Sequence, residues 1–222
     1  MVIYNMKEGT SKIDLLSYTK NGDLLVVNAA RCSFDKEHTV FDEEKDSRLL
    51  TYLAREGHVL PFRHPSATLR IYAPLFLIRQ IGKHQVGFSW SEVSRRYVST
   101  EPEFFFPEIL REASKDKKQG SKDTPVNQHL WTLHDMKDCV QSSLATYNHL
   151  LEKGVAPEQA RMVLPQNMFT TVVVTGTLLG WHHMFKLRTE EHTQKETQDL
   201  VYEIGDKMRK IFPHSWRALN KE

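Results

Sequence analysis

Ala67-Thr68-Leu69-Arg70-Ile71-Tyr72-Ala73-Pro74 is the stretch of the sequence that decides the fold. Apolar residues occupy every second position and alternate with Thr68, Arg70 and Tyr72, which is the period of a strand with one buried face. Pro74 then suits the first position of a helix, because its fixed φ angle is already helical. The sequence therefore predicts a strand that passes directly into a helix. The apolar residues of that helix expected to turn inward are Leu75, Phe76, Ile78 and Ile81.

A second strand is predicted at residues 168–175, where the sequence is rich in β-branched residues. The helical spacing of apolar residues, with glycine or proline near the ends, predicts the helices. They cover residues 24–34, the segment from Leu49 to a stop at Gly57, residues 124–154, residues 178–187, and the segment from Leu200 to Ile211. In the longest of them Thr124 is the expected cap, Pro125 lies in the first turn and Gly154 ends the helix. We expect its methionine and aromatic positions to pack in the core.

The polar run from Ser114 to Asp123 contains no apolar residue and predicts a mobile loop. No internal repeat and no linker between domains is visible in the sequence. The pattern predicts an α+β fold, with a small mixed sheet packed against several helices and one long amphipathic helix. We expect residues 1–222 to form a single domain.

The composition is that of an ordinary globular protein, with 222 residues of which 40% are hydrophobic and 26% charged. A net charge of +2 argues against nonspecific binding to a nucleic acid polymer. Cys32 and Cys139 lie far apart without the spacing of metal ligands, so we read them as reduced thiols. The start of the chain shows no cleavage-type signal, and no segment is apolar enough to cross a membrane. These features favour a cytoplasmic location.

One short segment, residues 79–97, combines cations, a histidine, a carboxylate and hydroxyl donors. It contains Arg79-Gln80-Ile81-Gly82-Lys83-His84-Gln85 and Ser91-Glu92-Val93-Ser94-Arg95-Arg96-Tyr97. This mixture suits a compact anion such as a phosphate, because arginine forks clasp two oxygens while hydroxyl and backbone N–H groups bind the remaining lone pairs. The alternative is a solvated basic turn.

A second polar cluster follows about a hundred residues later and includes Arg161, His183, Arg188 and His192. Such a set could bind a metal, stack on an aromatic ring or be solvated. A metal site needs converging ligands, and the nearby carboxylates lack the spacing of zinc proteases, so we predict no metal. Those carboxylates are Glu190, Glu191 and Glu196.

With both clusters in view, the chain resembles the flavin-dependent thymidylate synthases, also called thymidylate synthase complementing proteins, from Ala29 to Gln194. Five motifs carry the resemblance in order. They are Ala29-Ala30-Arg31-Cys32-Ser33, Gly57-His58-Val59-Leu60-Pro61-Phe62-Arg63-His64, Lys83-His84-Gln85 with Ser94 after eight residues, Arg161-Met162-Val163-Leu164-Pro165, and Leu187-Arg188 with His192 and Gln194. The family signature at the third motif is Arg-His-Arg, seven residues, then serine.

The resemblance implies reductive methylation of dUMP to dTMP, with methylenetetrahydrofolate as carbon donor and NADPH-reduced FAD as hydride source. It also implies which residues bind dUMP: Gln80, Lys83, Glu92, Val93, Ser94, Arg95, Arg96, Arg161 and Arg188. Arg188 is expected to be catalytic, because a guanidinium that is always charged can stabilise the anion at ring nitrogen 3 of uracil. The residues expected around FAD are Ser33, Leu60, Lys83, His84, Gln85, Glu92, Thr177, Leu179, His183, Leu187 and His192.

The sequence departs from the family pattern mainly on the flavin side. Lys83 and Gln85 replace the two signature arginines, and one extra residue precedes Ser94. Asparagine, arginine and asparagine are usual where Thr177, Leu179 and His183 stand. We read this as a divergent active branch that holds the FAD diphosphate differently, since lysine lacks the arginine fork and glutamine lacks the charge.

Two alternatives stay open at this point. One is a related flavin and folate enzyme that makes a hydroxymethyl pyrimidine nucleotide or acts on dCMP. The other is a nucleotide-binding module that has lost its flavin. The resemblance further implies a homotetramer whose active sites are shared between subunits.

Overall fold

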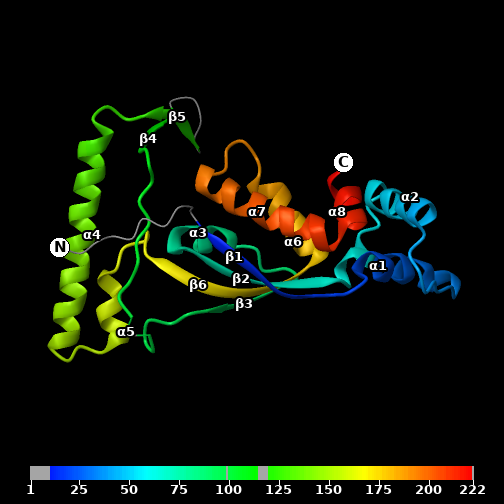
Figure 1. Ribbon diagram of the computed structural model, residues 1–222, viewed down its shortest axis with the longest axis horizontal. Coiled ribbons are helices and arrows are strands. Elements are labelled where there is room, and N and C mark those ends of the chain that lie inside the picture. Colours follow the sequence, from blue (N-terminus) through cyan, green and yellow to red (C-terminus); the bar gives the residue numbers. More distant parts are fainter. Residues whose placement is uncertain (1–10, 99, 115–119, 222) are drawn as a thin grey trace.

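Two long antiparallel strands form the centre of a four-stranded sheet (Figure 1). β2 (Ser66–Pro74) and β6 (Phe169–Thr177) pair along their full length, with Ser66 opposite Thr177 and Pro74 opposite Phe169. β1 (Lys12–Tyr18) lies beside β2, and β3 (Phe88–Glu92) lies beside β6. The computed structural model describes residues 11–98, 100–114 and 120–221.

The predicted α+β class is confirmed, but the sheet is not mixed. Each of its three described pairings is antiparallel. The alternation of apolar residues predicts where a strand lies and which face it buries, but it carries no information on the direction of the neighbouring strand.

The main hydrophobic core lies on one face of the sheet. β2 buries alternate residues on that face, as predicted, and β6 does the same with Val172 and Val174. The helices that contribute buried side chains to this core are α1 (Gly22–Arg31), α2 (Glu43–Arg55), α3 (Leu75–Ile81), α6 (Leu178–Arg188), α7 (Lys195–Ile211) and α8 (Pro213–Asn220). Figure 1 shows α3, α6, α7 and α8 together on one side of the strands. The helices predicted at 24–34, 178–187 and 200–211 are confirmed within a few residues, and Gly57 follows α2 in the left-handed conformation with φ 72°.

A second, separate hydrophobic cluster forms around α4 (His129–Glu152), which stands at one end of the molecule (Figure 1). It also involves α5 (Pro157–Ala160) and the 3-10 turn Arg161–Val163. Its buried members are Phe104, Phe106, Val140, Leu144, Tyr147, Ala160 and Met168. The core role predicted for Tyr147 is confirmed, and Met136 packs against the same cluster.

The start of the long helix was predicted too early. Thr124 and Pro125 belong to β5 (Ser121–Pro125), which pairs with β4 (Arg111–Ala113), and α4 begins only at His129. Part of the predicted loop at Ser114 to Asp123 is therefore strand, while residues 115–119 lie outside the described residues. All five residues of β5 are exposed, so no alternation of apolar residues marks it as a strand.

The sequence also gave no sign of β1, β3 and α8. In β1 only Ile13 is buried, so no apolar face marks that strand. β3 does alternate, with Phe88 and Trp90 partly buried between exposed Ser89 and Ser91, but over only five residues. No helix in the described part of the chain has the length and apolar character needed to span a membrane.

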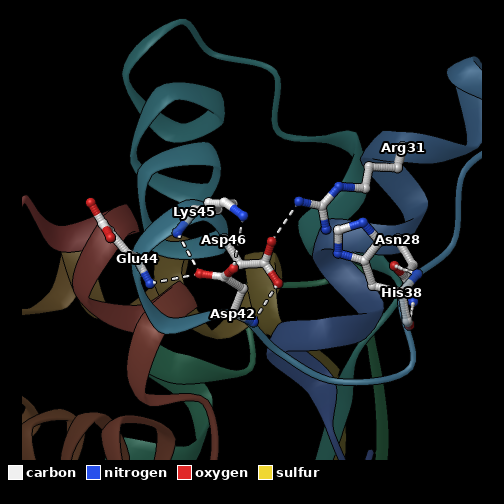
Figure 2. A network of polar contacts seen from close by, with 7 residues as sticks. All are labelled: Asn28, Arg31, His38, Asp42, Glu44, Lys45 and Asp46. Atoms are coloured by element: carbon white, nitrogen blue, oxygen red, sulfur yellow. Dashed lines mark hydrogen bonds and ion pairs between the residues drawn. The ribbon is translucent and has the colours of Figure 1, made fainter.

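A buried ion pair fastens α2 to α1 (Figure 2). Asp46 is fully buried; its Oδ1 lies 2.5 Å from Nη2 of Arg31, and its Oδ2 accepts from the backbone N–H of Asp42 at 2.9 Å. Asn28 holds the segment that follows α1 through two hydrogen bonds with the backbone of His38, at 2.8 and 3.0 Å. Polar contacts thus fix the stretch that carries Ser33, one of the predicted flavin residues.

Replacing Asp46 by asparagine should lower the free energy of unfolding by about 3 kcal/mol, because Arg31 would stay buried without a counter-charge. Urea unfolding followed by circular dichroism measures this. Glu44→Gln is the matched control, since Glu44 pairs with Arg48 on the exposed surface of the same helix and its loss should cost less than about 1 kcal/mol. Equal effects of the two substitutions would contradict the prediction.

Candidate functional site

A cleft of about 1170 Å³ opens beside α3, between the C-terminal end of β3 and the turn that carries Arg161. Both charged and aromatic side chains line it. The charged ones are Arg79, Lys83, Glu92, Arg95, Glu101, Glu103, Glu158 and Arg161. The cleft is large enough for a nucleotide, and its four cations suit the phosphate of one.

Two of the carboxylates in the cleft are bound by hydroxyl groups. Glu92 Oε1 accepts from Thr170 Oγ1 at 2.9 Å, and Glu103 Oε2 accepts from the hydroxyl of Tyr72 at 2.6 Å. Burial and the hydrogen bond to Glu103 raise the pKa of Tyr72, so this phenol stays protonated. Its ring stacks on that of Phe169, with centroids 4.7 Å apart and planes 8° from parallel, and both rings line the cleft.

The side chain of Arg95 is held by the backbone. Its guanidinium donates to the backbone carbonyls of Val98 and Thr100. Burial lowers the pKa of Arg95, but an arginine keeps its proton at any working pH. Just before it, Ser94 Oγ accepts from both the backbone N–H and Nε of Arg96, at 3.3 and 3.2 Å, which closes a tight turn.

Arg188 lies where the last turns of α3 and α6 meet. Its Nε donates to Nε2 of His84 at 3.1 Å, and its Nη2 donates to the backbone carbonyl of Gln80 at 3.2 Å. The last carbonyls of a helix lack intrahelical partners, and a cation is favourable at that end of the helix dipole. Arg188 therefore caps α3 and is held in place by it.

His84 is neutral in this arrangement. Its Nε2 accepts a hydrogen bond from Arg188, so its proton lies on Nδ1. Burial, together with the nearby Arg188 and His183, lowers the pKa of His84. Burial also lowers the pKa of His183, with Arg63 and Lys186 acting in the same direction. At neutral pH the positive charge of this cluster is thus that of Arg188.

The residues predicted to bind dUMP fall into three groups. Lys83, Glu92, Val93, Arg95 and Arg161 line the cleft. Gln80, three residues before Lys83, contacts Arg188 where the ends of α3 and α6 meet. Ser94 and Arg96 lie in the turn after β3.

The residues predicted to bind FAD are more dispersed within one chain. Lys83, Gln85 and Glu92 line the cleft, and His84 lies between Arg188 and His183, close to both. Thr177 caps α6 by accepting from the N–H of Gly180 at 3.1 Å, and the side chain of Leu179 faces the main core. The others are exposed and do not line the cleft: Ser33, Leu60, Leu187 and His192.

Sequence reasoning missed three residues of this region. Tyr72 and Glu103 form a wall of the cleft, and Thr197 donates a hydrogen bond to the side chain of Gln80. The alternation of β2 places Tyr72 on the face away from the main core. Thr197 lies on the buried face of α7 with Val201. These two positions were the signals in the sequence that could have indicated the residues. In the described ranges, no group of three or more histidine, cysteine or acidic side chains is arranged to hold a metal ion.

Comparisons with known proteins agree on one class. A flavin-dependent thymidylate synthase of Thermotoga neapolitana is 35% identical over 199 residues, which span 90% of this chain and 86% of that protein. One from Thermus thermophilus is 33% identical over 199 residues, or 90% of this chain and 72% of that protein. The crystal structure of the UMP/dUMP methylase PolB of Streptomyces cacaoi, bound with 5-Br dUMP, is similar with a TM-score of 0.86 and 26% identity, covering 96% of each chain.

The family model described as thymidylate synthase complementing protein matches residues 14–214. The chain belongs to this family, which confirms the resemblance seen in its motifs. It is therefore an enzyme of the flavin-dependent thymidylate synthase kind; the cofactor of the family is FAD, and NADPH and methylenetetrahydrofolate are its co-substrates.

The residues of the cleft fit a cofactor that carries a diphosphate. Lys83 and Arg79 place two cations on one wall. Gln85 lines the same cleft and donates from Nε2 to the carbonyl of Gly82, so it offers an amide but no charge. Negative oxygens can be neutralised here even though the two signature arginines are replaced.

Acid should destabilise the fold through His182, which is buried against Trp216 in the core. Burial, with His183 and Lys186, lowers the pKa of His182 from its ordinary 6.5 to about 4. The unfolded chain binds this proton at higher pH than the folded chain, so the free energy of unfolding should fall as the pH drops from about 6.5 to about 4.

Urea midpoints at about pH 7 and pH 5 should therefore differ less in His182→Gln than in the wild type. His134→Gln, which replaces an exposed histidine of α4, is the control and should keep the wild-type difference. An unchanged difference in His182→Gln would contradict the assignment.

Proposed function

We propose that this enzyme methylates dUMP to dTMP, taking the carbon from methylenetetrahydrofolate and the hydride from FAD reduced by NADPH. The observation that carries the proposal is the cluster of Arg188, His84 and Gln80 beside a cleft whose lining includes four cations, in a chain of this family. Residues 1–222 would act as one domain of this kind.

In this proposal the phosphate of dUMP is bound by the cleft. Lys83, Arg95 and Arg161 supply charge, and Ser94 supplies a hydroxyl in the turn that also carries Arg96. Arginine is suited to this role because its fork can donate to two phosphate oxygens at once. The neutral hydroxyl of Tyr72 and the stacked ring of Phe169 give the cleft one flat wall.

Arg188 is the catalytic residue of the proposal. A guanidinium has five N–H donors, and the contacts with His84 and Gln80 use two of them. The others can donate to the uracil edge and stabilise negative charge on the ring as the methyl group forms. His84 stays neutral, so it orients Arg188 without adding a competing charge.

When bound, FAD would supply the hydride. Lys83, His84, Gln85 and Glu92 would contact it from this chain. Ser33, Leu60, Leu187 and His192 lie outside the cleft of the same chain, which supports sites completed by residues of other subunits. We therefore propose a homotetramer with shared active sites.

The likeness to PolB favours one further candidate, a methylase that accepts UMP as well as dUMP. PolB is described as a UMP/dUMP methylase, and its structure with 5-Br UMP is also similar, with a TM-score of 0.84 and 25% identity. Assays with both nucleotides distinguish the two candidates.

Purified protein should show oxidised-flavin absorbance and convert dUMP to dTMP when NADPH and methylenetetrahydrofolate are added. Arg188→Ala should slow methylation by about a hundredfold to a thousandfold, because a charge-assisted contact made in the transition state is lost. Flavin reduction by NADPH should change far less. Stopped-flow spectroscopy of the two half-reactions measures both.

Arg188→Lys should recover only part of the loss, because an ammonium cannot present two parallel donors to a planar edge. Arg217→Ala, which removes an exposed arginine of α8, is the control and should leave both half-reactions unchanged. Equal losses in flavin reduction and methylation would remove Arg188 from the role assigned to it.

Shared sites predict complementation between inactive variants. Arg96→Ala and Arg188→Ala should regain activity when mixed and allowed to exchange subunits, provided that the two residues serve one site from different chains. Each variant incubated alone is the control. A monodisperse monomer with full activity at low concentration would exclude the homotetramer.

A further inference from the structure

The first turn of α7 is joined to the end of α3 by a buried polar contact. Thr197 is fully buried, and its hydroxyl donates to Oε1 of Gln80. Gln80 is also the residue whose backbone carbonyl accepts from Arg188. One residue, Gln80, therefore connects Thr197 with the proposed catalytic arginine.

The start of α7 is itself firmly held. Arg111 donates from Nη2 to both carboxylate oxygens of Glu196, at 2.7 and 2.8 Å, and from Nε to Ser121 Oγ at 2.8 Å. The side chains of Arg111 and Glu196 are only 17% and 11% exposed. Since Glu196 precedes Thr197, this pair fixes the position from which Thr197 reaches Gln80.

The contact decides which end of the Gln80 amide is free. With Oε1 bound to Thr197, the part of the amide left for a ligand is the nitrogen with its two N–H groups. Arg188 beside it also has only donors to offer. A donor-only pair suits the uracil edge, which presents carbonyl oxygens and, once nitrogen 3 loses its proton, a further acceptor. Cytosine has an amino group in place of one carbonyl, so a donor would face a donor.

We infer that Thr197 is a positioning residue that makes the site select uracil over cytosine, by fixing the Gln80 amide with its N–H groups toward the base. The inference rests on the proposed function, because it takes Gln80 as a nucleotide ligand. Thr197 does not touch the nucleotide; it acts only through Gln80.

The test is binding of dUMP and of dCMP to the oxidised holoenzyme, measured by isothermal titration calorimetry. Thr197→Val keeps the shape of the side chain but removes the hydroxyl, so the amide of Gln80 can turn over. The Kd for dUMP should rise about fivefold, the effect of losing one hydrogen bond, while the Kd for dCMP stays level or falls. Thr197→Ser should restore the wild-type ratio of the two.

If Thr197 had only a structural role, Thr197→Val would raise the Kd for dUMP and the Kd for dCMP by the same factor. Either that result or no change in either Kd would overturn the inference. If the wild type itself does not bind dUMP, the proposed function fails instead. Should Thr197→Val not fold, Gln80→Glu serves, because a carboxylate held by Thr197 turns an acceptor toward the base. Gln80→Glu should weaken the binding of dUMP more than that of dCMP. If Gln80→Glu bound dUMP with the Kd of the wild type, the inference would equally be overturned.

Discussion

The antiparallel ladder between β2 and β6 is the constraint on which the rest of the structure depends. It runs from Ser66 opposite Thr177 to Pro74 opposite Phe169, and each strand passes directly into a helix. α3 and α6 therefore start from opposite ends of the ladder and both pack into the core on the same face. The ladder is about 30 Å long and the helices about 10 and 16 Å, so their last turns meet, with Arg188 against Gln80.

This meeting of two helix ends explains the electrostatics of the site. Both ends carry carbonyl groups without intrahelical partners, and their partial negative charge attracts a cation. Arg188 is that cation, and it donates to the carbonyl of Gln80. Partial desolvation and the cations near them lower the pKa values of His84 and His183, which favours their neutral forms at neutral pH. The fold thus creates a position for one fixed positive charge before any ligand arrives.

Much of this architecture could be predicted from the sequence. Strands β2 and β6 and the helices after them follow from alternation and helical spacing, because one face of each element is buried. The direction of the sheet, the exposed strand β5 and the late start of α4 could not be predicted, since they depend on packing or bury nothing. Motifs indicated Arg188 and Lys83, whereas Thr197 and Gln80 meet across 117 residues through a contact that leaves no pattern in the sequence.

The cleft lies between the two hydrophobic clusters and is lined by residues of both. Ile78 belongs to the main core and Leu164 packs on the cluster around α4, and both line the cleft. An anion bound by Lys83 and Arg161 together would bridge the two clusters and act as a cross-link between them. By mass action, a ligand that binds only the closed cleft would stabilise the packing of the two clusters together.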